Sequence, residues 1–245
     1  MKRKKWLKLL LVGMIAALGA NCGTVKGWFG KKNPGPDRPP EVMAEEGIKK
    51  LKGKKYDAAI ETFEKVRDRY PYSDQALMAQ IKVADAYFYK KKYDEALGAY
   101  KEFEKLHPTN KAVPYCVYRQ ALCYYRQRST IDRDQSFTLK ALQEFRRLKQ
   151  KFPQCEYIPK ADKYMAKCIQ DLVEHEFYIA EFYYKNKRYQ AALDRYQGLV
   201  QEHPNFPQKA LAQARMEECQ KILNTPEEKK GGIISKVTSI FDAKW

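Results

Sequence analysis

Tyrosine, phenylalanine, lysine and arginine are the residues of this 245-residue sequence whose types and spacing suggest chemistry, and that chemistry is binding. Five aromatic residues fall where a groove between helices is expected, and three cations fall near its rim: Phe88, Tyr89, Tyr115, Tyr118 and Tyr125, with Lys52, Lys90 and Arg126. Aromatic rings stack on one another, and ammonium or guanidinium groups pair with a carboxylate. Such a groove suits an extended peptide with aromatic side chains and a free C-terminus. The alternative is that a good part of this set packs between repeats.

Cys22 is a second candidate for chemistry, because it follows a secretion signal. Basic residues near the start precede an apolar run, residues 9–18, which is too short to span a bilayer. The letters GANC resemble the site where bacterial lipoproteins are cleaved and acylated, although Gly19 and Asn21 depart from the usual pattern. A lipid on Cys22 would anchor a soluble domain to a membrane. The alternative is an ordinary signal peptide with a cysteine nearby.

No pattern in the sequence indicates catalysis, a cofactor or a metal site. His107 and His203 precede closing prolines at a position that other copies of a repeat fill with Tyr70 and Phe152, which indicates packing rather than a base or ligand. His175 has no second ligand at metal spacing. Glycine-rich phosphate loops and nucleophile motifs are missing as well. We therefore expect a protein that is not an enzyme.

The groove residues need helices to position them, and a stretch that occurs four times supplies these. The copies are residues 56–71, 93–108, 138–153 and 189–204. Each has an alanine three positions in, an aromatic residue four positions later, and a closing proline. Alanine lets a paired helix approach, the aromatic ring fills the space beside it, and proline cannot continue a helix. This pattern is typical of the second helix of a tetratricopeptide (TPR) repeat.

A partner helix precedes each copy and carries a small residue with an aromatic three positions later: Ala84 and Tyr87, Ala121 and Tyr124, Ala180 and Tyr183. The first repeat has only Gly47. The closing prolines are 37, 45 and 51 residues apart, longer than a regular TPR. The extra residues fall in a loop at 126–136 and in 155–172, so that residues 156–187 form one long helix or two nearly coaxial helices. We expect an all-α, irregular TPR-like solenoid of about five helix pairs.

Composition divides the chain into four parts. Residues 1–21 are predicted as a signal peptide, 22–40 as the lipidated cysteine with a flexible linker, and 41–223 as the solenoid. The tail, 224–245, contains a short amphipathic helix with an apolar stripe formed by Ile233, Ile234, Val237, Ile240, Phe241 and Trp245. This helix either folds back on the last repeat or serves a partner or a membrane surface.

Charge and cysteine content limit the partners. Without the five cations of the signal, 42 Lys and Arg stand against 30 Asp and Glu, a net charge of about +12. An exported protein rarely meets nucleic acid, so we interpret this excess as solvated helix faces with some attraction to an acidic surface or partner. Five cysteines remain after Cys22. Cys116 and Cys123 are too far apart along one helix for a mutual disulfide and most simply pack as small apolar residues, while a disulfide between distant helices stays open.

Six stretches carry a family resemblance: RDRYPYS (67–73), HPT (107–109), YCVYRQAL (115–122), IDRDQ (131–135), FPQCEY (152–157) and IAEFYYKNKRYQAALDR (179–195). With the signal and tether, they resemble the BamD family, the outer-membrane protein assembly lipoproteins of Gram-negative bacteria. The loop IDRDQ is the most specific stretch, because generic TPR proteins lack it. The resemblance covers roughly residues 20–223, and the tail lies beyond it.

The resemblance implies a non-enzymatic lipoprotein subunit of the β-barrel assembly machinery, lipid-anchored on the periplasmic face of the outer membrane. The N-terminal repeats would bind the C-terminal strands of unfolded outer-membrane β-barrel proteins. The C-terminal repeats would dock on the barrel insertase, beside other assembly lipoproteins. The alternative is a periplasmic TPR scaffold lipoprotein for envelope organisation or cell division.

The resemblance also singles out Arg195 as the docking residue, since its stretch matches the family where it meets the periplasmic domain nearest the insertase barrel. The alternative is an ion pair within the chain, for instance with Glu181.

Overall fold

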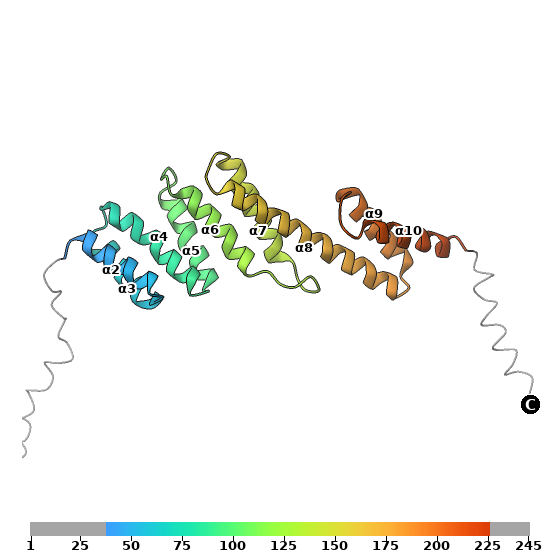
Figure 1. The fold of residues 1–245 in the computed structure, drawn as a ribbon, viewed down its shortest axis with the longest axis horizontal. Helices are drawn as coiled ribbons and strands as arrows, with labels where there is room; N and C mark the ends of the chain where they lie inside the picture. Colours follow the sequence, from blue (N-terminus) through green and yellow to red (C-terminus); the bar gives the residue numbers. More distant parts are fainter. Residues whose placement is uncertain (1–37, 226–245) are drawn as a thin grey trace, which may run out of the picture.

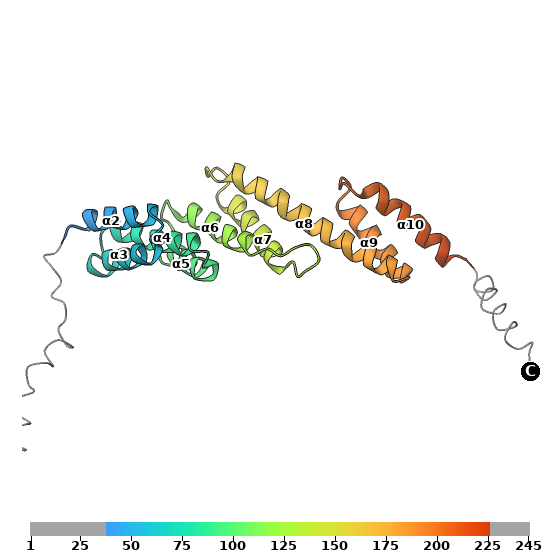
Figure 2. The same ribbon diagram turned by 60° about the horizontal axis from the view of Figure 1, so that its bottom comes forward.

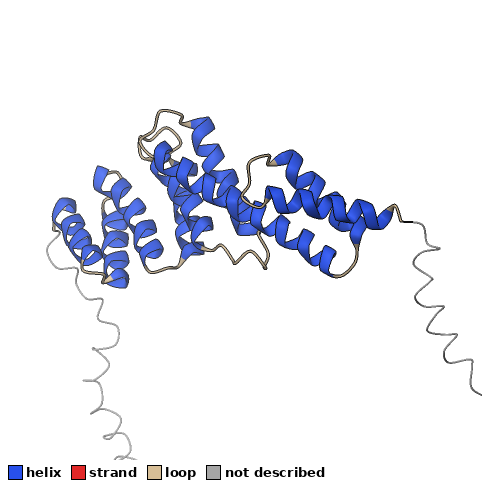
Figure 3. Cartoon of the chain, turned by 45° about the vertical axis from the view of Figure 1, so that its right-hand side comes forward, coloured by secondary structure: helices blue, strands red, loops and turns tan. Residues whose placement is uncertain are grey.

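The structure is a computed structural model that describes residues 38–225, and within these residues it contains nine α-helices and no strand. The helices are α2 (Pro40–Lys52), α3 (Tyr56–Arg69), α4 (Asp74–Tyr89), α5 (Tyr93–Leu106), α6 (Val113–Arg126), α7 (Ser136–Lys151), α8 (Ile158–Lys185), α9 (Tyr189–Glu202) and α10 (Lys209–Leu223). Figure 3 shows this all-helical composition. The expected fold class is confirmed.

The helices stack in a single row, each packed mainly against its neighbours in sequence. Figures 1 and 2 show an elongated array whose connecting turns alternate between two long edges. Residues 38–225 form four helix pairs, α2–α3, α4–α5, α6–α7 and α8–α9, followed by α10 as a single helix, where about five pairs were expected. This is the one-dimensional packing of a solenoid.

The four predicted copies of the repeat are α3, α5, α7 and α9, and the C-cap of each helix is the residue before its closing proline. These residues are Tyr70, His107, Phe152 and His203, with φ between −136° and −130° and ψ between 54° and 71°. A proline disfavours the helical conformation of the residue that precedes it, so the helix must stop there. The two histidines therefore occupy helix ends, as the sequence indicated.

The alanine and aromatic positions are buried in every copy. The alanines (Ala59, Ala96, Ala141 and Ala192) and the aromatics (Phe63, Tyr100, Phe145 and Tyr196) all have 0% exposed area. In the first pair Gly47 takes the small position, and a Cβ there would lie 2.6 Å from a ring carbon of Phe63. Close helix approach is therefore the reason for the small residues.

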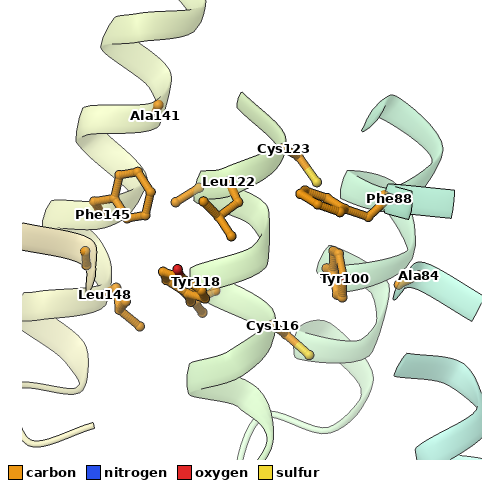
Figure 4. Packing of buried hydrophobic residues seen from close by; sticks show 14 of the residues in the cluster. Ala84, Phe88, Tyr100, Cys116, Tyr118, Leu122, Cys123, Ala141, Phe145 and Leu148 are labelled. Atoms are coloured by element: carbon orange, nitrogen blue, oxygen red, sulfur yellow. The ribbon is translucent and has the colours of Figure 1, made fainter. Parts of the chain in front are cut away.

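Three hydrophobic cores follow one another along the row. The N-terminal core lies among α2, α3 and α4, the central core runs from α4 to the first half of α8, and the C-terminal core joins the second half of α8 to α9 and α10. Figure 4 shows the central core, where Tyr118, Phe145 and Leu148 pack beside Leu122.

The cysteines of the described residues are all free, and four of the five are buried. Burial raises the pKa of Cys116 and Cys123 to about 12. A thiol in such a place is neutral and packs as a small apolar group, which agrees with the first interpretation of these residues.

Helix α8 is one continuous helix of 28 residues, so the first of the two expected forms is the one observed. Ala161 and Cys168 belong to the central core, Val173 and Ala180 belong to the C-terminal core, and Ile169 contacts both. The two cores are therefore joined through a single helix.

The inserted loop between α6 and α7 is held against α8 by two contacts. Arg128 Nε lies 3.1 Å from Asp171 Oδ2, and His175 Nδ1 donates to the carbonyl oxygen of Ile131 over 2.5 Å. His175 is thus a structural residue that fixes the loop, which contains the stretch IDRDQ.

The signal peptide, Cys22, most of the linker and the amphipathic stripe of the tail lie outside the described residues. Helix α2 begins at Pro40, the last residue of the predicted linker, and Arg38 donates a hydrogen bond to Glu46 over 2.8 Å. Of the helices at 38–225, none combines the length and the apolar character needed to cross a bilayer.

Candidate functional site

Two adjoining hollows form a groove on the face built by the first helices of the pairs. One, of about 360 Å³, is lined by Leu51, Lys52, Lys54, Tyr56, Lys82, Asp85, Tyr89 and Tyr115. The other, of about 470 Å³, is lined by Met78, Ile81, Lys82, Lys111, Ala112, Pro114, Tyr115, Cys155, Glu156 and Tyr157. Lys82 and Tyr115 line both hollows. We call these two hollows together the N-terminal groove.

Three of the eight predicted groove residues line it, namely Lys52, Tyr89 and Tyr115. Tyr89 is 50% exposed, and its ring stacks on that of Tyr56 with centroids 6.4 Å apart. An exposed, stacked ring of this kind can accept another aromatic ring without moving. Lys90 lies beside the groove and pairs with Asp57.

The remaining predicted residues lie elsewhere. Phe88 and Tyr118 are buried, with 8% and 7% of their areas exposed. Tyr118 stacks on Tyr157, a groove residue, with centroids 5.1 Å apart. Tyr125 packs against Tyr164 and under the guanidinium of Arg128, and Arg126 is exposed at the end of α6. Phe88, Tyr118 and Tyr125 therefore pack between helices and do not line the groove.

Asp85 forms the floor of the groove, and the sequence reasoning did not single it out. Its carboxylate is 2% exposed and accepts hydrogen bonds from Tyr100 and Tyr115, both over 2.6 Å, and from Lys82 over 2.9 Å. A buried carboxylate requires such donors, because its desolvation is costly. The network fixes the ring of Tyr115 at the junction of the two hollows.

Arg119 is the second residue that the sequence reasoning missed. It is 7% exposed, its Nε donates to Tyr100 over 2.9 Å, and its guanidinium lies 3.8 Å from the ring centroid of Phe88. Its Nη2 is buried and has no hydrogen-bond acceptor among the described residues. The sequence does contain a signal for Asp85 and Arg119. Each is a charged residue among apolar neighbours on the inner face of its helix, in the stretches VADA (83–86) and YRQA (118–121).

The electrostatics of this network fix the charge states of Arg119 and the two tyrosines. Burial alone would lower the pKa of Arg119, but Tyr100, Tyr115 and Asp85 outweigh it and raise the pKa above its ordinary value. Burial, followed by the charge of Asp85, raises the pKa of Tyr100 and Tyr115. The guanidinium is therefore charged and both tyrosines are neutral donors at any physiological pH.

The arrangement of the N-terminal groove is suited to binding a ligand. Lysines 52, 54, 82 and 111 lie around aromatic rings, of which Tyr89 is exposed, and this suits an anionic ligand with aromatic groups. No group of three His, Cys, Asp or Glu side chains in this part of the chain could hold a metal ion.

A further cavity, of about 550 Å³, lies between α8 and the α9–α10 turn. Its walls are mostly apolar, and its charged residues are Glu174 and Glu202, so it lacks the cations and exposed rings that would recognise a chain terminus. The N-terminal groove is therefore the better candidate.

Arg195, the predicted docking residue, lies on α9 in an ion pair within the chain. Its Nη1 is 2.9 Å from Glu176 Oε2, and its guanidinium lies 5.4 Å from the ring centroid of Tyr183. Both charged side chains are exposed, at 38% and 48%. Glu181, the partner considered from the sequence, instead accepts a hydrogen bond from Tyr196 over 2.6 Å.

Comparison with known families and proteins adds an independent observation. The family described as Outer membrane lipoprotein (YfiO) matches residues 36–232. A Caulobacter vibrioides protein named Outer membrane protein assembly factor BamD is 28% identical to this chain. The alignment covers 79% of this chain and 64% of the length of that protein. A Rickettsia prowazekii protein of the same name is 29% identical over 100% of this chain and 95% of its own length.

Solved structures give more distant likenesses. The TPR2AB domain of yeast Sti1, in a complex with pHSP90, aligns with 72% of this chain and 70% of its own, with a TM-score of 0.44 and 15% identity. This likeness is too distant to bear on function.

Proposed function

Because the chain belongs to the Outer membrane lipoprotein (YfiO) family, we propose that it is a non-enzymatic subunit of the machinery that assembles β-barrel proteins in the outer membrane. Relatives named Outer membrane protein assembly factor BamD align with most of the chain and support this role. Its place is the periplasmic face of that membrane, where a lipid on Cys22 anchors it. A helical solenoid with a groove suits an adaptor.

The N-terminal groove binds the C-terminal segment of an unfolded barrel protein. The observation that carries this proposal is the meeting of aromatic rings and cations in one hollow, where the exposed Tyr89 and the half-buried Tyr115 lie beside Lys52, Lys54 and Lys82. A peptide that ends in an aromatic residue presents a ring and a carboxylate only a few ångströms apart, so both features of the groove are used at once.

The C-terminal repeats dock on the barrel insertase through the face of α9 that carries Arg195. Its ion pair with Glu176 is exposed and therefore weak, so the guanidinium can exchange this partner for one on another protein at little cost. Other assembly lipoproteins complete the complex.

Peptide binding tests the groove. A peptide ending in phenylalanine should lose about fivefold in affinity when Tyr89 is replaced by alanine, since one stacked ring contributes about 1 kcal/mol. Lys52→Ala should weaken the peptide acid but not the peptide amide. Isothermal titration calorimetry with both peptides measures each effect.

Tyr178 offers the matched control, because it is 46% exposed but lies on α8, away from the groove. Tyr178→Ala should leave the affinity unchanged. Equal affinities for acid and amide in the parent protein would show that the cations do not recognise the chain end. Failure of the protein to co-purify with the insertase would instead favour a scaffold elsewhere in the envelope.

A further inference from the structure

The turns at one long edge of the solenoid are basic, whereas the turns at the other edge are not. The turns inside the four helix pairs lie along the lower edge in Figure 1 and comprise residues 53–55, 90–92, 127–135 and 186–188. They contain nine lysines and arginines. The turns between pairs contain a single lysine or arginine, Lys111. These turns are residues 70–73, 107–112, 152–157 and 203–208. The charge of the chain is therefore distributed unevenly between its edges.

Most of these cations have no partner within the chain. We define the basic edge as residues 52–55, 90–92 and 185–188. Seven of its cations are exposed and form no ion pair at residues 38–225: Lys52, Lys54, Lys55, Lys91, Lys185, Lys187 and Arg188. Only Lys90 and Lys92 are paired, with Asp57 and Glu95. The third turn is excluded because Arg128 is already bound to Asp171 and the other cation, Arg133, stands between Asp132 and Asp134.

The backbone of the basic edge indicates that the cations are not incidental. Lys54, Lys91 and Lys187 have φ of 59°, 65° and 59°, and each follows the end of a first helix at the same place in its turn. This left-handed conformation is the one for which glycine is usual, and other residues adopt it at a cost. In all three turns a lysine holds that position.

Exposed aromatic side chains lie next to these cations. Tyr89 precedes the second turn and is 50% exposed, and Phe182, one helical turn before the fourth turn, is 55% exposed. Rings beside lysines and arginines are the combination found where proteins rest on the headgroup region of a membrane.

We propose that the basic edge binds an anionic phospholipid surface. A membrane is flat and extended, so it can contact turns that follow one another along a straight edge, whereas a peptide ligand would occupy the groove. Each lysine or arginine held near an anionic surface strengthens binding about fivefold. This contact is additional to the lipid anchor. Lys52, Lys54 and Tyr89 also line the peptide groove of the proposed function, whereas Lys55, Lys185 and Arg188 do not.

The anchor can reach when the protein lies on this edge. Helix α2 begins at the opposite edge, and its 13 residues span about 20 Å. The 17 residues between Cys22 and Pro40 reach at most about 60 Å. The tether is therefore long enough to pass one helix length and still enter the membrane.

Vesicle binding tests the proposal. The full mature chain with Cys22→Ser, which carries no acyl group, is sedimented with vesicles of phosphatidylcholine alone or with one quarter phosphatidylglycerol. We expect binding only to the anionic vesicles, weakening with salt. The variant Lys55→Gln/Lys185→Gln/Arg188→Gln removes three cations without touching the left-handed positions. It should lower the partition coefficient on the order of a hundredfold, about fivefold for each cation.

The matched control removes the same charge from the other side of the molecule. Lys105, Lys160 and Lys163 are exposed, form no ion pair at residues 38–225, and lie at the end of α5 and the start of α8. Their replacement by glutamine should change binding less than threefold, because about 20 Å separates the two edges and the Debye length is about 10 Å. Circular dichroism checks that both variants fold.

Three results would overturn the proposal: equal losses in both variants, equal binding to neutral vesicles, or no binding to anionic ones. The peptide assay distinguishes this failure from failure of the groove, since Lys55, Lys185 and Arg188 do not line it.

Discussion

Glu104 joins three helices through its carboxylate. It accepts hydrogen bonds from Gln120 on α6, from both terminal nitrogens of Arg147 on α7, and from Lys151, over distances of 2.7 to 3.1 Å. Burial alone would raise its pKa, but the bonds from Arg147, Gln120 and Lys151 outweigh burial and lower the pKa to about 2. The ionised form thus stabilises the contact between the second and third pairs.

The pH dependence of unfolding should report this carboxylate. Because its pKa is lower in the folded than in the unfolded protein, its contribution is complete above the unfolded pKa, near 4.5, and is lost as the pH falls towards 2. The lowering corresponds to about 3 kcal/mol. Urea unfolding at pH 6 and pH 3 should therefore show a smaller loss of stability in Glu104→Gln than in the parent.

Glu102→Gln is the matched control on the same helix, since Glu102 is exposed and forms no ion pair at residues 38–225. A loss of stability between pH 6 and pH 3 that is identical in the parent and in Glu104→Gln would contradict the assigned role.

Individual packing positions were predictable from the sequence, whereas the buried ionic network was not. Alanine and aromatic positions recur four times, so their burial follows from the repeat. Asp85 and Arg119, in contrast, do not recur in all four repeats. A single charged residue on one helix does not indicate which residue of the facing helix it will contact. The position of Tyr118 along its helix fits a groove-facing tyrosine and a buried one equally well. The stacking of Tyr157 on its ring, which buries it, is not visible in the sequence.

At the scale of the helices, boundaries were predictable wherever local chemistry sets them. The four second helices end where a proline forbids continuation. The continuity of α8 does not follow from the sequence, because the same periodicity fits one helix or two coaxial ones. Its joint packing against two cores, through Ile169, is tertiary information.

Glycine positions in the helices should respond in opposite ways to an added methyl group. Gly47→Ala should destabilise the protein by about 1–2 kcal/mol, because the new Cβ would meet the fully buried ring of Phe63 and overpacking outweighs the gain in helix propensity. Gly98→Ala should instead stabilise it by about 0.5–1 kcal/mol, since nothing lies within 4 Å of that Cβ.

Thermal and urea unfolding of the two variants measure this difference, and Gly198→Ala, also without a neighbour within 4 Å, provides a second case of the favourable kind. If Gly47→Ala were as stable as Gly98→Ala, close approach of α2 and α3 would not be the reason for the glycine.

At the scale of the whole molecule, the docking proposal separates stability from assembly. Arg195→Glu breaks an exposed ion pair worth about 0–1 kcal/mol, so the melting temperature should hardly change. A charge pair desolvated across an interface costs about 2–5 kcal/mol when one partner is reversed. We therefore expect the variant to fold normally and to lose co-purification with the insertase.

Lys163→Glu, an exposed charge reversal on the first half of α8, should retain co-purification. Restoration of Arg195→Glu by an opposite reversal on the insertase would identify the pair. A variant that melts earlier yet still co-purifies would make Arg195 a structural residue.

The continuity of α8 also sets the rotational phase between the two halves of the molecule. Its 28 residues extend about 42 Å, and each residue turns the helix by about 100°. One residue inserted near Ile169 would rotate α9 and α10 by that angle about the axis of α8, whereas seven residues would lengthen the molecule by about 10 Å and nearly restore the original orientation. The number of residues in α8 therefore determines the direction in which α9 and α10 face relative to the N-terminal groove.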